Sequence, residues 1–278
     1  MNGLYRNIMS IGSATTFSAS ARLTNFNPDK ILFYVSSGSA ISKADLAKIA
    51  VTINFKNSVG SGIAVTPNLP LDMVADLNDF EAGNGGVYGT DTVGAFCLDI
   101  GKYCLRADDE MTFNISTTAT LTNACGLIVK AVDTKIAKEK LISYAFISAV
   151  ANQAYQNSGV VAVYGSISSP SDSVFITTDD FFGSNNLSEI AVIALGAAVG
   201  RAENVDNFGP VWIDDTGLSQ DVTVRAGSSN ERFLVKIWNF DANRIGYERS
   251  EFNSAKLLAD SIQKGNPSKY KALRYYYG

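Results

Sequence analysis

Short apolar segments, separated by Ser, Gly, Asn or Asp, recur along the whole chain and constrain its fold more than any other feature. The segments are rich in β-branched and aromatic residues, which favour strands over helices. They lie at 31–35, 49–55, 111–115, 126–132, 174–177, 190–195, 211–213, 221–224 and 233–238. Many short strands at this spacing are typical of β-sandwiches and barrels, so the sequence predicts an all-β protein.

The second half of the chain repeats residues of the first half in the same order. The matched positions are Pro28 with Pro170, Phe33 with Phe175, 46–51 with 187–192, Thr112 with Thr223, and 129–130 with 235–236. The offset shrinks along the chain because the first half holds an additional segment at about 57–94. A proline has no amide hydrogen and fits best just before a first strand. We therefore predict that Pro28 and Pro170 open two copies of one sandwich; the alternative is that short apolar runs match by chance.

This repeat divides the chain into five predicted regions. They are an N-terminal arm at 1–27, a first sandwich at 28–133, a connector at 134–169, a second sandwich at 170–240 and a C-terminal region at 241–278. The connector begins with a stretch rich in Ala, Lys, Leu and Glu, which predicts a helix after Asp133. A further helix is predicted at 250–265, with Ser250 as its N-cap and Gly265 at its end.

The chain contains no histidine, which excludes Ser-His-Asp and Cys-His catalysis and His-ligated metals. Each acidic pair, such as 179–180, lies in a turn-like context where solvated carboxylates are ordinary. The cysteines Cys97, Cys104 and Cys125 are odd in number and form no C-x-x-C pair, which predicts buried thiols rather than disulfides or zinc ligands. The sequence therefore predicts a protein that is not an enzyme and needs no cofactor.

One segment has the composition of a calcium-binding loop. Its candidate oxygen ligands are Asp76, Asn78, Asp79 and Glu81. These residue types suit a hard cation, but Phe80 stands where the EF-hand pattern requires an oxygen. A structural Ca²⁺ is therefore kept as an alternative to a chain without metal. The glycine-rich segment 83–89 lacks the Lys and Ser/Thr of a phosphate-binding loop and is predicted to be a surface loop.

Positive charge gathers at the two ends of the chain. The formal net charge is −4, yet residues 1–28 hold two basic and no acidic side chains, and residues 261–278 hold four basic and none acidic. Tyrosines accompany the C-terminal charges, a combination that suits an anionic membrane surface or a nucleic-acid backbone. The predicted membrane- or genome-facing residues are Arg6, Arg22, Lys264, Lys269, Lys271, Arg274, Tyr275, Tyr276 and Tyr277. Packing of this tail on a neighbouring subunit is the alternative.

The sequence resembles the double jelly-roll major capsid proteins of tailless, membrane-containing viruses of the tectivirus and corticovirus type. The resemblance is carried by the paired openers Pro28 and Pro170, the paired segments 46–51 and 187–192, and the connector after Asp133. The resemblance implies two eight-stranded jelly rolls side by side in each chain. It also implies homotrimers of pseudo-hexagonal outline that tile an icosahedral shell around an internal membrane, with the chain's ends toward the lipid. The second copy is short for eight strands, which is a departure from that pattern.

From this resemblance we expect a virion protein, made in the host cytoplasm, whose partners are neighbouring trimers, viral membrane lipid and minor capsid proteins. No specific recognition of nucleic acid is expected. The alternative function is a carbohydrate-binding or adhesive β-sandwich protein that uses the loops at about 76–88, with or without bound calcium. A secreted adhesin is expected to carry an export signal, and residues 1–21 do not resemble one.

Overall fold

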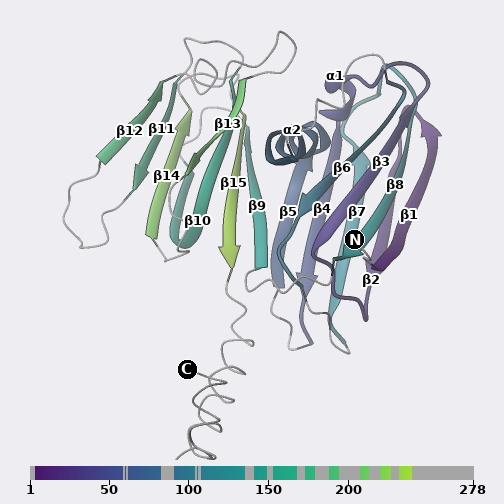
Figure 1. Cartoon of the computed structure of the whole chain (residues 1–278), viewed down its shortest axis with the longest axis horizontal. Helices are drawn as coiled ribbons and strands as arrows, with labels where there is room; N and C mark the ends of the chain where they lie inside the picture. Colours follow the sequence, from purple (N-terminus) through teal and green to yellow (C-terminus); the bar gives the residue numbers. More distant parts are fainter. Residues whose placement is uncertain are drawn as a thin grey trace, which may run out of the picture. The chain divides into compact units, whose positions relative to one another are not determined.

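Antiparallel β-sheets dominate the protein, as expected of an all-β chain (Figure 1). The structure is a computed structural model. It describes residues 4–58, 60, 62–82, 91–103, 105, 108–134, 141–148, 153–167, 173–178, 188–193, 207–212, 220–226 and 232–239. Residues 1–239 belong to one unit, and the predicted helix at 250–265 lies outside the described residues. Within the described residues, no helix has the length and apolar character needed to cross a membrane.

Eight strands build the first sandwich. They are β1 (Leu4–Ala14), β2 (Ser18–Leu23), β3 (Lys30–Ser37), β4 (Ile49–Lys56), β5 (Gly62–Pro70), β6 (Val93–Asp99), β7 (Glu110–Thr117) and β8 (Cys125–Asp133). They form two sheets in the orders β1-β8-β3-β6 and β2-β7-β4-β5, and neighbouring strands pair antiparallel. Apart from the β4–β5 hairpin, consecutive strands alternate between the two sheets, so the chain crosses repeatedly over a shared core.

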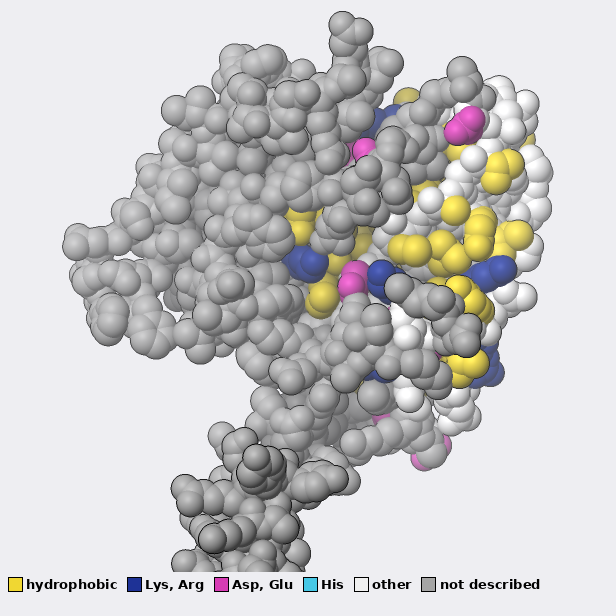
Figure 2. Space-filling model, in the orientation of Figure 1, with side chains coloured by type: hydrophobic (Ala, Val, Ile, Leu, Met, Phe, Trp, Pro, Cys, Tyr) yellow, Lys and Arg dark blue, Asp and Glu magenta, His cyan; other side chains and the backbone are white. Residues whose placement is uncertain are grey.

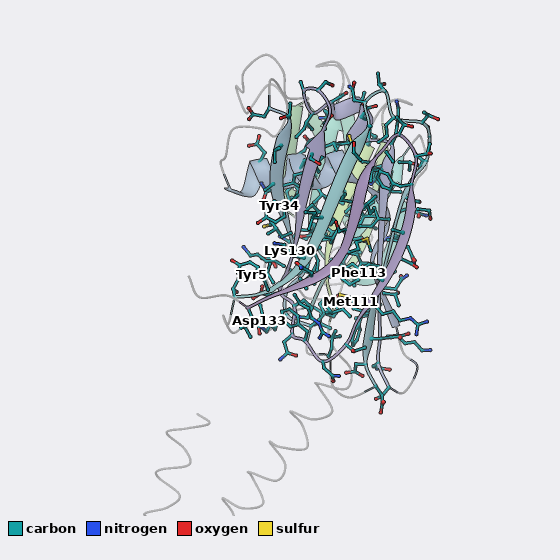
Figure 3. The ribbon with its side chains drawn as sticks, turned by 90° about the vertical axis from the view of Figure 1, so that its right-hand side faces the viewer. Tyr5, Tyr34, Met111, Phe113, Lys130 and Asp133 are labelled. Carbon is teal, nitrogen blue, oxygen red and sulfur yellow. The ribbon has the colours of Figure 1, made fainter. Side chains whose placement is uncertain are left out.

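The core of the first sandwich follows from the two-residue period of its strands. In β3 the side chains of Ile31, Phe33 and Val35 are buried, and in β7 those of Met111 and Phe113 are buried. The Phe33 ring stacks on the ring of Phe96 with 5.8 Å between centroids. Figure 3 labels Met111 and Phe113 of this core. Burying one such large side chain stabilises the fold by about 1.5–3 kcal/mol.

The predicted insertion at 57–94 is not a long loop, because it contributes strand β5, helix α2 (Leu71–Ala82) and the start of β6. The short helix α1 (Lys43–Leu46) precedes β4. Leu71, Val74 and Leu77 of this helix are each no more than 1% exposed, so the apolar side chains of the segment are part of the core. The predicted calcium loop at 76–81 is therefore wrong in conformation, since these residues form the second half of α2.

In the part of the chain that the structure describes, seven strands build the second sandwich. They are β9 (Leu141–Ser148), β10 (Gln153–Ile167), β11 (Ser173–Thr178), β12 (Ser188–Ile193), β13 (Asn207–Trp212), β14 (Gln220–Ala226) and β15 (Arg232–Asn239). The long strand β10 serves in two places: residues 153–158 pair with β14, and residues 159–167 pair with β15 and β13. The resulting orders are β9-β15-β10-β13 and β10-β14-β11-β12.

These orders are the same as those of the first sandwich when the two parts of β10 are counted separately. The strands β9, β10 (153–158), β10 (159–167), β11, β12, β13, β14 and β15 then correspond, in chain order, to β1 through β8. The predicted duplication is confirmed at the level of topology. The second copy looked short for eight strands because its predicted start at Pro170 left out β9 and β10.

The register of the predicted repeat is correct in its later part and wrong in its earlier part. Residues 129–130 and 235–236 lie in the corresponding strands β8 and β15, and Thr112 and Thr223 lie in β7 and β14. Phe33, however, lies in β3 and Phe175 in β11, which corresponds to β4. The match was displaced by one strand because short apolar strands resemble one another, because β9 was not expected, and because the predicted second sandwich began only after β10.

Two predicted regions are corrected by these strands. Residues 4–23 are not an N-terminal arm, because β1 pairs with β8 and β2 pairs with β7 inside the first sandwich. The connector is not helical at 141–148, because these residues form β9 and pair with β15. Its Ile, Tyr and Phe side chains favour a strand, and pairing with β15 outweighed the helix propensity of the preceding Ala, Lys and Glu. The second sandwich therefore begins at β9 rather than at Pro170.

Where the chain leaves the first sandwich, a buried polar cluster holds it. Asp29, which has no exposed surface, accepts a hydrogen bond from the backbone N–H of Thr134 at 2.9 Å. The Lys102 Nζ atom lies 2.5 Å from Asp133 Oδ1 and 3.9 Å from Asp29 Oδ2. The lysine thereby compensates two buried carboxylates, which fixes the end of β8 against the start of β3.

Candidate interaction surface

The outer face of the β2-β7-β4-β5 sheet is polar. In the edge strand β2 and the inner strands β7 and β4, polar side chains alternate along the strand with side chains that point into the core. The polar side chains are Ser18, Ser20, Arg22, Thr112, Asn114, Ser116, Thr52, Asn54 and Lys56. Such alternation is the usual pattern of a sheet that faces water on one side. This face needs no covering partner.

The outer face of the β1-β8-β3-β6 sheet carries several apolar side chains among polar ones such as Ser10, Lys30, Ser36 and Lys130, and we call it the apolar face. Its apolar part is formed by Tyr5, Leu32, Tyr34, Val93, Ala95 and Ile128. Tyr5 is 62% exposed, Val93 64% and Ile128 41%. Together with Leu4 at the start of β1, these are the exposed large hydrophobic side chains among the described residues. Figure 2 shows hydrophobic side chains gathered over this sheet, and Figure 3 labels Tyr5 and Tyr34.

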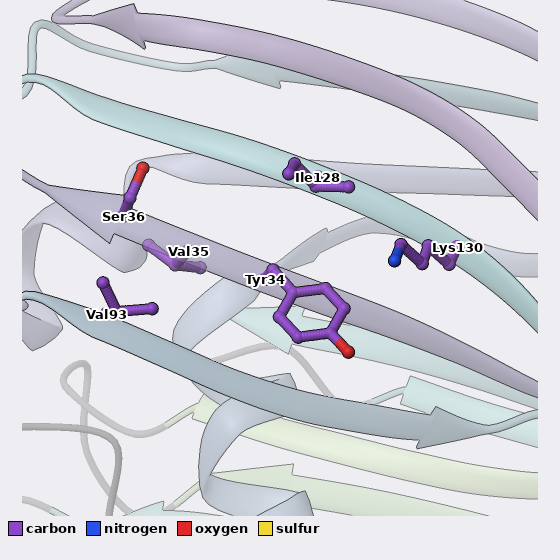
Figure 4. Close-up of a pocket in the computed structure, with 6 residues that line it drawn as sticks. All are labelled: Tyr34, Val35, Ser36, Val93, Ile128 and Lys130. Carbon is purple, nitrogen blue, oxygen red and sulfur yellow. The ribbon is translucent and has the colours of Figure 1, made fainter.

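A shallow hollow of about 410 Å³ lies in the apolar face (Figure 4). It is lined by Tyr34, Val35, Ser36, Val93, Ile128 and Lys130. The Lys130 Nζ atom lies 5.1 Å from the centroid of the Tyr34 ring, a cation–π contact. The hollow therefore offers an aromatic and aliphatic floor with one cation at its margin, which suits packing against another protein surface better than chemistry.

The sequence contained a signal for this face that the search for motifs missed. Residues 127–129 are Leu-Ile-Val, a continuous apolar run, and all three lie in strand β8. A strand that is apolar on both sides is typical of burial on both faces. By contrast, β7 alternates between apolar and polar residues over 111–115 and faces water on one side.

The two N-terminal arginines predicted to face a membrane or a genome are held within the first sandwich. Arg6 lies in β1, and its Nη1 atom donates a hydrogen bond to the backbone oxygen of Thr24 at 2.6 Å. Arg22 lies in β2, and its Nη1 atom is 3.6 Å from Glu110 Oε2. The remaining residues of that set, from Lys264 to Tyr277, lie outside the described residues.

The candidate calcium ligands also have other partners. The Asp76 carboxylate is buried and lies 2.7 Å from the Lys43 Nζ atom. The Asn78 side-chain oxygen accepts a hydrogen bond from the backbone N–H of Cys97 at 2.9 Å. Asp79 is 7% exposed, and Glu81 belongs to the same helix. In the described part of the chain, no three His, Cys, Asp or Glu side chains gather as a metal site would require.

The shifted pKa values of Asp45, Cys97 and Cys125 are explained by burial and by hydrogen bonds that hold the fold together. Burial alone would raise the pKa of Asp45, but hydrogen bonds from the backbone N–H groups of Thr122 and Asn123 and from Lys48 outweigh it and lower the pKa. Burial raises the pKa of the Cys97 and Cys125 thiols. Both thiols are therefore protonated at neutral pH and are poor nucleophiles.

Comparison with solved structures identifies the architecture. The STIV MCP matches 86% of this chain and 96% of its own, with a TM-score of 0.54 and 9% identity. A chain from the atomic structure of Sulfolobus Turreted Icosahedral Virus matches 85% of this chain and 90% of its own, with a TM-score of 0.55 and 10% identity. The chain has the double jelly-roll fold. At this low identity the likeness shows the fold alone.

The double jelly roll is consistent with the strand orders, since each half has the eight strand positions of a jelly roll. The major capsid protein P2 from Bacteriophage PM2 matches 86% of this chain and 99% of its own at 12% identity, but its TM-score of 0.47 is too low to add to this result. No family model matches the sequence, and no curated protein matches it.

Proposed function

We propose that this protein is the major capsid protein of an icosahedral virus, which assembles as homotrimers that tile the shell. The observation that carries the proposal is the double jelly-roll fold over most of the chain, which it shares with the STIV MCP. Its place of action is then the virion, after synthesis in the host cytoplasm. Neighbouring trimers and minor capsid proteins are its further partners.

The two sandwiches supply a physical reason for this assembly. Each chain carries two units of the same topology, so three chains present six similar units, and a ring of them has a pseudo-hexagonal outline. Hexagonal outlines tile a surface without gaps. The apolar face of the first sandwich supports association as well, because exposed apolar side chains gathered on one face mark candidate interaction sites.

The chemistry of the described residues supports a packing role rather than catalysis. The chain has no histidine, and burial raises the pKa of the thiols of Cys97 and Cys125. The buried carboxylates Asp72 and Asp76 lie beside the cations Arg232 and Lys43. These groups hold the fold together, and a shell protein needs no cofactor.

The mass of the purified full-length protein in solution tests this proposal. Light scattering across a range of protein concentrations is expected to give three times the chain mass of 29.7 kDa, or larger assemblies. A strict monomer at every concentration and salt condition would overturn the capsid proposal.

We further propose that the C-terminal tail faces the membrane inside the shell. Residues 261–278 carry four basic and no acidic side chains, and three consecutive tyrosines follow Arg274. Basic side chains attract an anionic lipid surface, and tyrosines settle at the headgroup level. Arg6 and Arg22 contribute less, because each has a partner within the first sandwich.

Deleting residues 269–278 tests this orientation. The truncated protein is expected to keep its circular dichroism spectrum and to lose binding to vesicles that contain anionic lipid at low salt. Vesicles of neutral lipid are the matched control and are expected to bind neither protein. Unchanged binding of the truncated protein to anionic vesicles would refute the membrane-facing role while leaving the capsid proposal intact.

A further inference from the structure

The apolar face of the first sandwich has a counterpart in the second sandwich. Strands β1, β8, β3 and β6 correspond to β9, β15, β10 and β13. Tyr34 lies opposite Ile128 in the β3–β8 pair, and Tyr164 lies opposite Leu234 in the β10–β15 pair. Lys130 and Lys236 follow two residues later in β8 and β15. The two outer faces therefore carry the same tyrosine, aliphatic and lysine positions.

The corresponding residues differ sharply in exposure. Ile128 is 41% exposed, whereas Leu234 has no exposed surface, and Tyr164 is likewise fully buried.

The first residues of the edge strands show the same contrast. Leu4 lies opposite Asp133 and Leu141 opposite Asn239, the last residues of β8 and β15, so Leu4 corresponds to Leu141. Leu4 is 52% exposed and Leu141 is 4% exposed. The next pair along the strands is Tyr5, 62% exposed, and Ile142, 9% exposed. Residues that are open in the first sandwich are thus closed in the second.

The first sandwich of the same chain covers this face of the second sandwich. Edge strand β5 lies against edge strand β9, and helix α2 contacts β13. The Ile142 N–H donates a hydrogen bond to the Ile100 backbone oxygen at 3.0 Å, and the Tyr144 hydroxyl donates one to the Asp99 backbone oxygen at 2.7 Å.

A buried ion pair completes this intrachain contact. The Arg232 Nη2 atom in β15 lies 2.7 Å from Asp72 Oδ2 at the start of α2. The position that corresponds to Arg232 in the first sandwich is Gly126, because each lies opposite a serine, Ser166 and Ser36, at the same place in its strand pair. The ion pair is therefore specific to the intrachain contact, whereas both sandwiches have the apolar positions.

We infer that the apolar face of the first sandwich is covered by the second sandwich of another copy of this chain, in the way that the first sandwich covers the second within one chain. The inference rests on the proposed self-assembly and assigns a surface to it. Edge strand β12 corresponds to β5, so β12 of the neighbouring copy is the strand placed against β1.

A second copy of this chain is the occupant that the intrachain contact favours. The contact within the chain is heterologous, since it joins an edge of one sandwich to a face of the other, and a heterologous contact repeats until it closes a ring or runs on as a filament. Every chain has one exposed apolar face, on its first sandwich. Its second sandwich has β12 at the edge position that β5 occupies in the first sandwich, and β5 is the strand that makes the intrachain contact. Three chains that alternate intrachain and interchain contacts form a ring of six sandwiches.

Two substitutions of the same kind test this surface in the full-length protein. Ile128→Glu places a carboxylate at the centre of the apolar face, and Asn114→Glu places one on the polar outer face of the other sheet of the same sandwich. Ile128→Glu is expected to raise the dissociation concentration of the trimer at least 100-fold, because a buried charge without a partner is strongly unfavourable. Asn114→Glu is expected to leave it within about twofold, as surface substitutions usually do.

Mass photometry and light scattering separate the outcomes. A trimeric wild-type protein with a monomeric, folded Ile128→Glu variant supports the inference. Trimers that persist in Ile128→Glu overturn the inference but leave the capsid proposal standing. A wild-type protein that is always monomeric overturns both.

If Ile128→Glu does not fold, the rate of thiol labelling in the less disruptive variants Ile128→Cys and Asn114→Cys provides a second test. Maleimide labelling at Ile128→Cys is expected to be at least tenfold slower than at Asn114→Cys in the trimer, and comparable to it after dilution to monomers. Peptide mass spectrometry separates these sites from the native cysteines. Equal labelling of both sites in the trimer would overturn the inference. Protection of position 128 that persists in monomers would also overturn it, because the chain's own tail would then be the occupant.

Discussion

The two sandwiches share one strand plan but differ in what lies on one outer face. In the second sandwich, Tyr164 and Leu234 are fully buried and belong to one hydrophobic cluster with residues of α2 in the first sandwich. In the first sandwich, the corresponding Ile128 is 41% exposed and Tyr34 lines an open hollow. Both faces carry apolar side chains, although only the face of the second sandwich is covered within the chain. We therefore interpret the exposed face of the first sandwich as an interface as well. The following predictions test that comparison, beginning with the largest expected effect.

Removing a core side chain of the first sandwich is expected to have the largest effect. Phe113→Ala deletes a fully buried ring and is expected to lower the free energy of unfolding by about 3–5 kcal/mol. Urea unfolding followed by circular dichroism measures the change. Because the second sandwich rests on the first, both are expected to unfold in one transition. A variant in which only part of the signal shifts would show that the sandwiches are independent. The adjacent exposed Asn114→Ala is the control and is expected to change stability by less than about 0.5 kcal/mol.

Breaking the intrachain ion pair is expected to have the next largest effect. Arg232→Met removes the cation beside Asp72, a carboxylate with no exposed surface. The loss of stability is expected to be about 3 kcal/mol, because a buried carboxylate loses its compensating charge. Hydrogen exchange at β9 and β15 is expected to rise with it. The double variant Arg232→Met with Asp72→Leu is expected to recover most of the loss. A stable single variant with unchanged exchange would show that the ion pair does not hold the two sandwiches together.

Acid is expected to weaken the first sandwich through Asp45, which fixes α1 to the loop before β8. Hydrogen bonds lower the pKa of Asp45 in the folded protein, so its ionised form stabilises the fold above pH about 4. This contribution is lost as the pH falls through the folded-state pKa. Asp45→Asn is expected to cost about 1–2 kcal/mol at pH 7, and the difference from wild type is expected to shrink at lower pH. A difference that stays constant from pH 7 to pH 2.5 would contradict this account.

The smallest effect is expected at Lys130, which lies within the apolar face opposite Leu32 and whose Nζ atom lies over the Tyr34 ring. Lys130→Met removes a partly exposed cation–π contact and is expected to change the free energy of unfolding by no more than about 1 kcal/mol. Because the substitution makes the face more apolar, it is expected to tighten association of the copies. Sedimentation at several concentrations measures this change. Weaker association would show that Lys130 itself binds the neighbouring copy.

The sequence predicted the all-β class and the duplication, because strands are encoded locally by short apolar runs and by β-branched residues. It did not predict β9, since the Ala-, Lys- and Glu-rich start of the connector favours a helix, and only pairing with β15 selects a strand. That error displaced the match of Phe33 with Phe175 by one strand. A separate error left β1 and β2 outside the first sandwich. Register shifts interrupt the apolar alternation of β1, and Leu23 is the one large apolar side chain of β2.

The interaction surface was less predictable than the fold. The run Leu127-Ile128-Val129 indicates a strand buried on both sides, but a single strand does not reveal which other strands complete its outer face. Tyr34 and Val93 join Ile128 only through the order β8-β3-β6, which is set by pairings between segments far apart in the sequence. The acidic segment at 76–81 was misread for a related reason. Its apolar neighbours Val74 and Leu77 bury it as a helix against the sandwich.

Electron cryomicroscopy of the assembled full-length protein tests the central claim most directly. The predicted result is a three-chain ring in which the apolar face of each first sandwich packs against the β12 side of the second sandwich of the next copy, with Ile128 buried in that contact. Two results would contradict the account. They are an assembly in which this face is open to solvent, and one in which it packs against the same face of another copy.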